Sequence, residues 1–300
     1  MKVIYRTIAC LALLALVISA PAAAQQQGQG QSQQPPPTPP KQPGQAPPKQ
    51  PAQPGQAPPG QLPTDQPAAP PLNKEEEDGY KAFYDTKATE FTLQITLGEE
   101  FLAKFPESRY RESVLARIAR AYQNTGQEDK MFSSGEKVLA INPDHVEILA
   151  MMAEAMPRRV NLQALDANQK LTTAEKYARR VIELVPTLTK PEAMLDDAFI
   201  KAKNELLAQA NSGLGLVLFY RGQFASAVTS FEEVTKLSAT PEPVDFYLLG
   251  MALSRAQRFA DAATAFEKCA EKPTGLQATC TKERDDAKKK AAPPPSAPKP

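Results

Sequence analysis

The feature that most constrains the fold of this chain is a pattern that repeats after about 35 residues toward its C-terminal end. Each copy places a Leu and a Gly in a first apolar segment, then a turn residue, then Phe, Ala and Phe in a second apolar segment. Small residues at these positions let two helices approach closely, and the Phe side chains fill the gap beside them. The pattern therefore predicts helical hairpins. The two copies are Leu214-Gly215, Gly222, Phe224, Ala227 and Phe231, and Leu249-Gly250, Gln257, Phe259, Ala262 and Phe266.

Prolines divide the surrounding sequence into segments of similar length. Between residues 73 and 290, apolar residues recur at helical spacing and no stretch alternates like a strand. A proline just beyond a helix cannot continue it, so each such proline predicts a turn. The interval between these stops, about 35 to 45 residues, fits two short helices with their turns. The stops are Phe105-Pro106, Asn142-Pro143, Val185-Pro186 and Lys272-Pro273.

Another copy fits the same pattern, with its large, small, aromatic, turn and terminal positions in order. Together the copies resemble the tetratricopeptide repeat (TPR), which places Leu-Gly in a first helix, Gly at the turn, Ala and an aromatic residue in the second helix, and Pro at the end. The resemblance implies an all-α fold over residues 73–290. It is expected to be a right-handed α-solenoid of about five helical hairpins with a C-terminal capping helix near residues 281–290. The additional copy comprises Leu115, Ile118-Ala119, Tyr122, Gly126, Val138 and Asn142-Pro143.

Other hairpins fit the repeat less regularly. The first, made of residues 73–85 and 93–106, lacks a clear small-residue signature. The third has extra residues around Pro157 to Lys170, so we expect a longer connection between its helices. The charged amphipathic segment 191–209 predicts an unusually long first helix for the fourth hairpin.

The two ends of the chain predict export and a spacer. Residues 1–24 carry positive charges, a short apolar run and then small residues, which is the pattern of a secretory signal peptide. The apolar run is too short to span a bilayer, so we expect no stable membrane insertion after signal cleavage. Residues 25–72 are almost entirely Gln, Pro, Gly and Ala, and the tail 291–300 is rich in Pro and Ala, which predicts disorder in both. The sequence thus predicts an exported bacterial protein, either periplasmic or secreted.

Composition argues against several classes of function. Signal cleavage reduces the 35 basic residues to 33 against 34 acidic ones, and this balance attracts neither nucleic acid nor anionic lipid. The single histidine, His145, is expected to be a solvated turn residue with no second histidine for a metal site. No Gly-rich phosphate loop or nucleophile elbow is found. The acidic run 75–78 fits a helix start capped by Asn73 better than an acid–base pair. We therefore expect no catalysis, metal or cofactor.

Two cysteines remain after signal cleavage, Cys269 and Cys280. They lie close together in sequence, and an exported protein reaches a compartment that permits disulfides. They are therefore candidates for a disulfide. The alternative is that Cys269 is a small buried core residue and Cys280 is a free thiol.

The resemblance also implies a binding surface. In TPR proteins the first helices of the hairpins line an inner groove, which can hold a protein or peptide. Aromatic rings supply contact area there, while Arg and Gln side chains can bond an extended backbone. For Phe219 and Tyr220, packing between repeats is the alternative. The repeat pattern places in the groove Arg120, Gln123 and Asn124; Glu147 and Glu154; Gln209, Ser212, Phe219 and Tyr220; and Tyr247 and Arg255.

Three functions follow from such a chain. The first is a non-catalytic adaptor or scaffold of the cell envelope that binds a protein or peptide in its groove. The second is a periplasmic carrier of peptidoglycan fragments or another small ligand, although the chain has no Trp for stacking on sugars. The third is a structural subunit that uses its convex face. The identity of the partner, the oligomeric state and any role of the linker as a ligand stay open.

Overall fold

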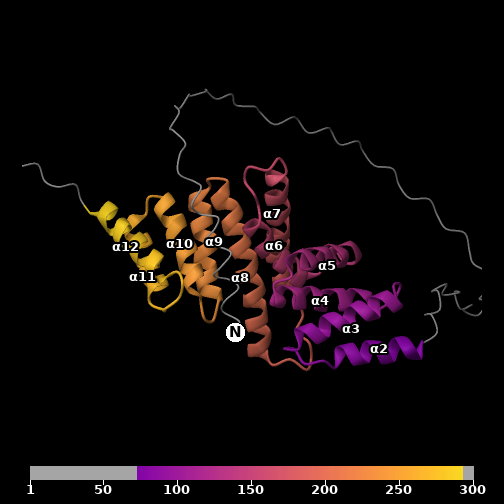
Figure 1. Ribbon diagram of the computed structural model, residues 1–300. Coiled ribbons are helices and arrows are strands. Elements are labelled where there is room, and N and C mark those ends of the chain that lie inside the picture. The colour runs from indigo at the N-terminus through magenta and orange to yellow at the C-terminus, as the bar shows by residue number, and fades with distance from the viewer. Residues whose placement is uncertain (1–72, 293–300) are drawn as a thin grey trace, which may run out of the picture. The chain divides into compact units, whose positions relative to one another are not determined.

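The computed structural model describes residues 73–292, and within that range every regular element is a helix (Figure 1). The predicted all-α fold is therefore confirmed. The predicted signal peptide, linker and most of the tail fall on residues 1–72 and 293–300, which lie outside the described residues. The elements are α2 (Lys74–Tyr84), α3 (Phe91–Lys104), α4 (Arg111–Thr125), α5 (Glu128–Ile141), α6 (Val146–Arg158), α7 (Ala167–Leu184), the short η1 (Val185–Thr187), α8 (Asp196–Tyr220), α9 (Phe224–Leu237), α10 (Pro243–Arg255), α11 (Phe259–Ala270) and α12 (Gln277–Ala291).

The helices pack as hairpins in chain order: α2 with α3, α4 with α5, α6 with α7, α8 with α9, and α10 with α11, with α12 against α11. Helices α3, α5, α7 and α11 end just before the predicted proline stops. The structure also contains the two predicted irregularities, a longer connection in the third hairpin and a long first helix in the fourth. Eight residues, 159–166, separate α6 from α7, and α8 has 25 residues against 13 in α10.

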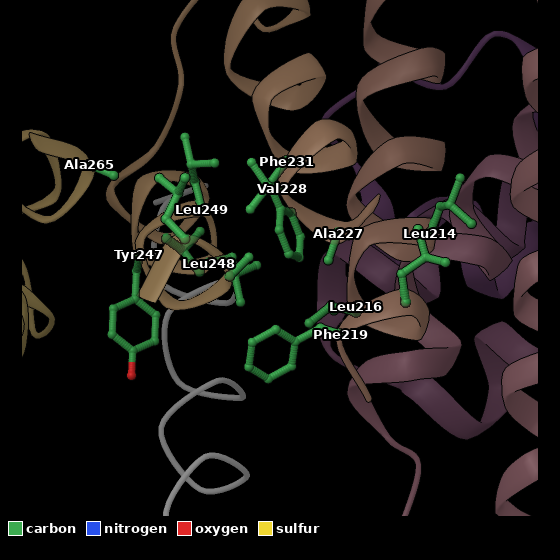
Figure 2. Close-up of a cluster of buried hydrophobic side chains, with 14 of the residues drawn as sticks. Leu214, Leu216, Phe219, Ala227, Val228, Phe231, Tyr247, Leu248, Leu249 and Ala265 are labelled. Atoms are coloured by element: carbon green, nitrogen blue, oxygen red, sulfur yellow. The ribbon is translucent and has the colours of Figure 1, made fainter. Parts of the chain in front are cut away.

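Glycines bring the paired helices of the last two hairpins into close contact. A Cβ atom on Gly215 would lie 2.6 Å from Cε1 of Phe231, and one on Gly250 would lie 2.7 Å from Cε1 of Phe266. Both Phe side chains are buried, and Figure 2 shows the ring of Phe231 beside Ala227. The ring of the second helix thus occupies the space that the glycine of the first helix leaves open, as the repeat pattern predicts.

The turn inside three of the hairpins has the same backbone geometry. Its key residue has a positive φ in each case, 73° at Gly126, 75° at Gly222 and 61° at Gln257. In each turn the amide after this residue donates to a carbonyl five residues earlier; the bond from Gln127 to Tyr122, for example, measures 2.9 Å. Glycine takes this conformation without steric cost, whereas Gln257 adopts it because the surrounding helices fix the turn.

Helix α6 joins two apolar cores. Leu149 and Ala153 belong to the core that extends through α8 to α12, while Ile148 and Met152 belong to the core of α2 to α5. The contact between α6 and α8 is especially close, because a Cβ atom on Gly213 would lie only 2.1 Å from the carbonyl oxygen of Ala153. Side chains cannot separate the two helices at this point.

Side chains cap the first helical turns of α2 and α6. The side chain of Asn73 accepts a hydrogen bond of 3.1 Å from the Glu75 amide at the start of α2. His145 lies in the predicted turn, because its amide donates to the Asn142 carbonyl at 3.2 Å, but it is half-buried rather than fully solvated. Its Nδ1 atom accepts from the Ile148 amide at 3.4 Å, so the side chain also caps α6.

The C-terminal helix is tied to the last hairpin. Cys269 of α11 and Cys280 of α12 form a disulfide, with their Cα atoms 5.9 Å apart, and both side chains are buried. Helix α12 begins before the predicted capping segment 281–290, because its first turn carries Cys280 into the core. Within residues 73–292, no helix is both long and apolar enough to cross a membrane.

Candidate functional site

Helices α4, α6 and α8 enclose a hollow of about 290 Å³, which we name the α4–α6–α8 groove. It contains four of the predicted groove residues: Arg120, Gln123, Glu147 and Gln209. The structure adds five lining residues that the sequence reasoning missed, namely Ile148, Met151, Ala202, Glu205 and Leu206.

Helical spacing explains why these residues meet. Arg120 and Gln123 lie one turn apart on α4, and Ile148 and Met151 lie one turn apart on α6. On α8 the lining residues are spaced by three, four and seven positions from Ala202, which places them on one face of the helix. Three separate helices thus contribute one stripe each.

The third wall exists because α8 is long. Ala202, Glu205 and Leu206 lie in the N-terminal part of α8, ahead of the Gly213 contact with α6. The periodic apolar and charged pattern of residues 191–209 is the sequence signal for this wall. This pattern predicted helix α8, but it did not indicate which neighbouring helices α8 would face.

The groove combines an apolar floor with a polar rim. Ile148 and Met151 are buried, Leu206 is half-buried, and Ala202 and Glu205 are exposed. Arg120 forms an ion pair with Glu147, and more than half of each side chain remains exposed. Such exposed pairs contribute little to stability, so both groups can exchange partners at low cost.

Several polar side chains at the rim have no bonding partner within the described residues. The amides of Gln123 and Gln209 form no side-chain hydrogen bond there, and Glu205 forms no ion pair there. The remaining predicted residue of α4, Asn124, bonds its own helix, because its Nδ2 atom donates to the Arg120 carbonyl at 2.8 Å.

Two predicted groove residues are instead buried between α6 and α8. Glu154 forms an ion pair of 3.2 Å with Arg158, whose Nη2 atom donates to the Ser212 hydroxyl at 3.0 Å. Both Glu154 and Ser212 are at most 5% exposed. This network holds α6 against α8 and presents no open surface.

The aromatic residues predicted for the groove pack between hairpins. Phe219 and Tyr247 are buried, and the Arg255 guanidinium lies 4.6 Å from the ring centre of Phe224 and 5.9 Å from that of Phe219. Tyr220 is half-buried and packs against the same core. The structure therefore does not bring these four predicted residues into the α4–α6–α8 groove.

A second hollow, of about 260 Å³, lies over α10 between α9 and α11. Its apolar floor includes Phe246 and Leu253, and Thr264 stands at its exposed side. Its charged side chains are balanced in sign, with Glu232 and Asp261 against Arg258 and Lys268.

Neither hollow brings together groups for metal chemistry. Among residues 73–292, no set of three or more His, Cys, Asp or Glu side chains is placed to hold a metal ion.

The fold is that of a helical-repeat protein. Comparison with known families identifies one of its repeats. Residues 112–145 match the tetratricopeptide repeat family, and this segment contains α4 and α5 with the Arg120 and Gln123 wall. This match supports the resemblance for that hairpin. A search of curated proteins finds no match to the chain.

Solved structures that match this chain have low sequence identity. A thermophilic TPR protein of Thermus thermophilus is 18% identical, with 71% of this chain and 98% of that chain covered and a TM-score of 0.45. MamA AMB-1 is 19% identical, with 66% and 97% covered and a TM-score of 0.44. A tetratricopeptide repeat protein from Parabacteroides merdae is 16% identical, with 71% and 91% covered and a TM-score of 0.32.

Proposed function

We propose that this protein is a non-catalytic adaptor that holds a protein or peptide partner in the α4–α6–α8 groove. The observation that carries this proposal is the groove itself, where a buried apolar floor is bordered by the exposed Arg120–Glu147 ion pair and by three polar side chains that have no bonding partner within the described residues. Apolar surface of this kind favours binding when an incoming side chain removes it from water. The TPR segment 112–145 supplies one wall.

The chemistry of the groove suits binding better than catalysis. Its charged groups are Arg120, Glu147 and Glu205, and the first two pair with each other. A catalytic site needs an acid, a base or a nucleophile held against a second oriented group, and these residues do not form such a set.

We also propose that the protein works outside the cytoplasm, with residues 25–72 as a spacer between the folded part and its point of attachment or release. The leader-like residues 1–24 support this proposal. The mass of the protein recovered from the envelope or medium tests it. A chain that begins at Gln25 is the expected result, and a chain that retains Met1 to Ala24 would contradict it.

Site-specific photo-crosslinking tests the groove. One variant carries an amino acid with a small aliphatic diazirine side chain at Ala202, which leaves the groove open, and a matched variant carries it at Thr264, in the second hollow; both positions are exposed. We expect the residue at position 202 to form a covalent adduct of defined mass with the partner. The yield of this adduct should fall when Gln123→Ala and Gln209→Ala are added. An adduct at 202 that these substitutions do not reduce would argue against the groove.

The second hollow favours a different function, a structural subunit that docks through the α9–α11 face. Its apolar floor over α10 is the observation that supports this alternative. The same experiment separates the two functions, because a partner on that face would form its adduct from position 264 and leave position 202 unlabelled.

A further inference from the structure

The α4–α6–α8 groove has an unbalanced charge, and this points to the kind of partner it takes. We propose that it selects an extended peptide segment in which a basic residue stands next to a large apolar one. This inference rests on the proposed function, because it names the chemistry of the partner for the same groove.

The apolar requirement comes from the floor. Ile148 and Met151 of α6 are 3% and 5% exposed, and the half-buried Leu206 of α8 faces the same hollow. Because Ile148 and Met151 are already buried, a Leu-type or Phe-type side chain from a partner would remove chiefly Leu206 and the exposed Ala202 from water. This burial of apolar area would favour binding.

The basic requirement comes from Glu205. Arg120 and Glu147 neutralise each other across the rim, so Glu205 leaves the groove with one net negative charge. Lys201 lies one helical turn before Glu205, yet the two form no ion pair within the described residues and Lys201 does not line the groove. A partner cation beside the apolar side chain would satisfy this carboxylate.

The extended conformation follows from the two amides. Gln123 on α4 and Gln209 on α8 border the same hollow, and neither side chain is bonded within the described residues. Each amide offers two donors and one acceptor oxygen, which matches the alternating carbonyl and amide groups of an extended peptide.

The protein's own linker meets only part of this requirement. It offers Lys41 and Lys49, but the residues beside both lysines are Pro and Gln, so no large apolar side chain is available at either position. The observations therefore favour a separate partner, and occupancy by the linker becomes one outcome of the test.

The test uses the full chain and a library of capped nonapeptides with Leu fixed at the centre and random flanks. We expect Lys and Arg to be enriched next to the Leu, with Glu205→Gln lowering the affinity of the selected peptides about two- to fivefold, the range for one partly exposed charge. Glu205→Lys should shift the preference to Asp and Glu. The matched control is Asp197→Lys, which makes the same charge change on an exposed part of α8 outside the groove and should leave the preference unchanged.

The remaining outcomes separate the two proposals. If Ala202→Trp, which fills the groove, leaves peptide retention unchanged or if no peptide is retained, the proposed function fails. If Ala202→Trp abolishes retention but the peptides show no basic preference, the groove binds and this inference is overturned. A synthetic peptide of residues 39–50 that competes as well as the selected peptides would make the linker the occupant and overturn the inference of a separate partner. Circular dichroism of each variant shows whether it remains folded.

Discussion

The hairpins at the two ends of the repeat region share one plan, but different contacts join them. In α2 to α5, polar and aromatic side chains cross between hairpins. In α8 to α12, a disulfide closes the end. Close contacts at glycines occur in both halves, because a Cβ atom on Gly98 of α3 would lie 2.4 Å from Cγ2 of Ile118 in α4. The two halves therefore differ in their response to charge and pH, which act on the first, and to redox conditions, which act on the second.

The polar and aromatic contacts of the N-terminal half join α2 and the loop after it to α4 and its N-cap residue. Tyr80 of α2 stacks on Tyr110, with ring centres 3.8 Å apart, and the Tyr110 hydroxyl donates to the Glu77 carboxylate at 2.8 Å. Arg117 of α4 donates to the carbonyls of Tyr84 and Thr86 at 2.7 and 2.6 Å. These bonds fix the first hairpin without the small-residue pattern that marks the other repeats.

The largest expected effect is loss of the disulfide in the C-terminal half. Replacement of Cys269 and Cys280 together by Ala should lower the free energy of unfolding by about 3 kcal/mol, because the cross-link no longer restricts the unfolded chain. Denaturant unfolding measures this loss. Hydrogen exchange should show that α11 and α12 lose protection while α3 and α4 keep theirs, and equal loss in both halves would contradict the comparison.

Close packing between α6 and α8 gives the next effect. Gly213→Ala should destabilise the protein by about 2 to 3 kcal/mol, because the added Cβ meets the backbone of Ala153 and the helices must separate. The matched control is Gly79→Ala in α2, where the nearest atom, Cδ2 of Phe101, lies at an ordinary contact distance of 3.4 Å. That change should stabilise by about 0.5 to 1 kcal/mol through helix propensity. A similar loss from both would show that the destabilisation does not come from the close contact between α6 and α8.

A smaller effect is expected at the polar contacts of the N-terminal half. Arg117→Met keeps an apolar stem but removes three hydrogen bonds to Tyr84 and Thr86, and it should cost about 1 kcal/mol. Thermal unfolding together with exchange at Thr86 measures it. A loss that instead appears in α11 would mean that the two halves unfold as one unit.

Acid should act on the N-terminal half through Glu99. Hydrogen bonds from Tyr122 and Lys130 lower the pKa of this carboxyl group below its ordinary value of 4.5, although burial opposes them. Because the pKa is lower in the folded state, the stabilisation is present above the ordinary pKa and is lost as the pH falls through the folded value. Glu99→Gln should make the loss of stability below pH 4.5 less steep. An unchanged loss would show that groups other than Glu99 cause it.

The sequence identified the last two hairpins because a glycine fixes a helix contact in each of them. Gly215 and Gly250 predicted their hairpins because nothing larger fits against Phe231 and Phe266. The proline stops predicted the helix ends because proline cannot continue a helix. The first hairpin has a close contact at Gly98 as well, but this glycine does not stand at the Leu-Gly position of the repeat, so the pattern did not mark it.

The groove was predictable only in part. Arg120, Gln123, Glu147 and Gln209 were found because the repeat assigns their helix faces. Phe219 and Tyr247 share such faces, but neighbouring hairpins cover them. Glu205 and Leu206 were missed because an irregular extension lies outside the repeat register, and its neighbour depends on the packing of α8 against α6.

The N-terminal extension of α8 separates specificity from folding. The Gly213 contact fixes α8 against α6 at one level, and the residues before it add a wall without changing that contact. Each further turn lengthens the wall by about 5.4 Å while the register of the hairpins stays the same. Under the proposed function, the partner can therefore be changed by altering this one N-terminal segment of α8, while the repeats that carry it keep their sequence.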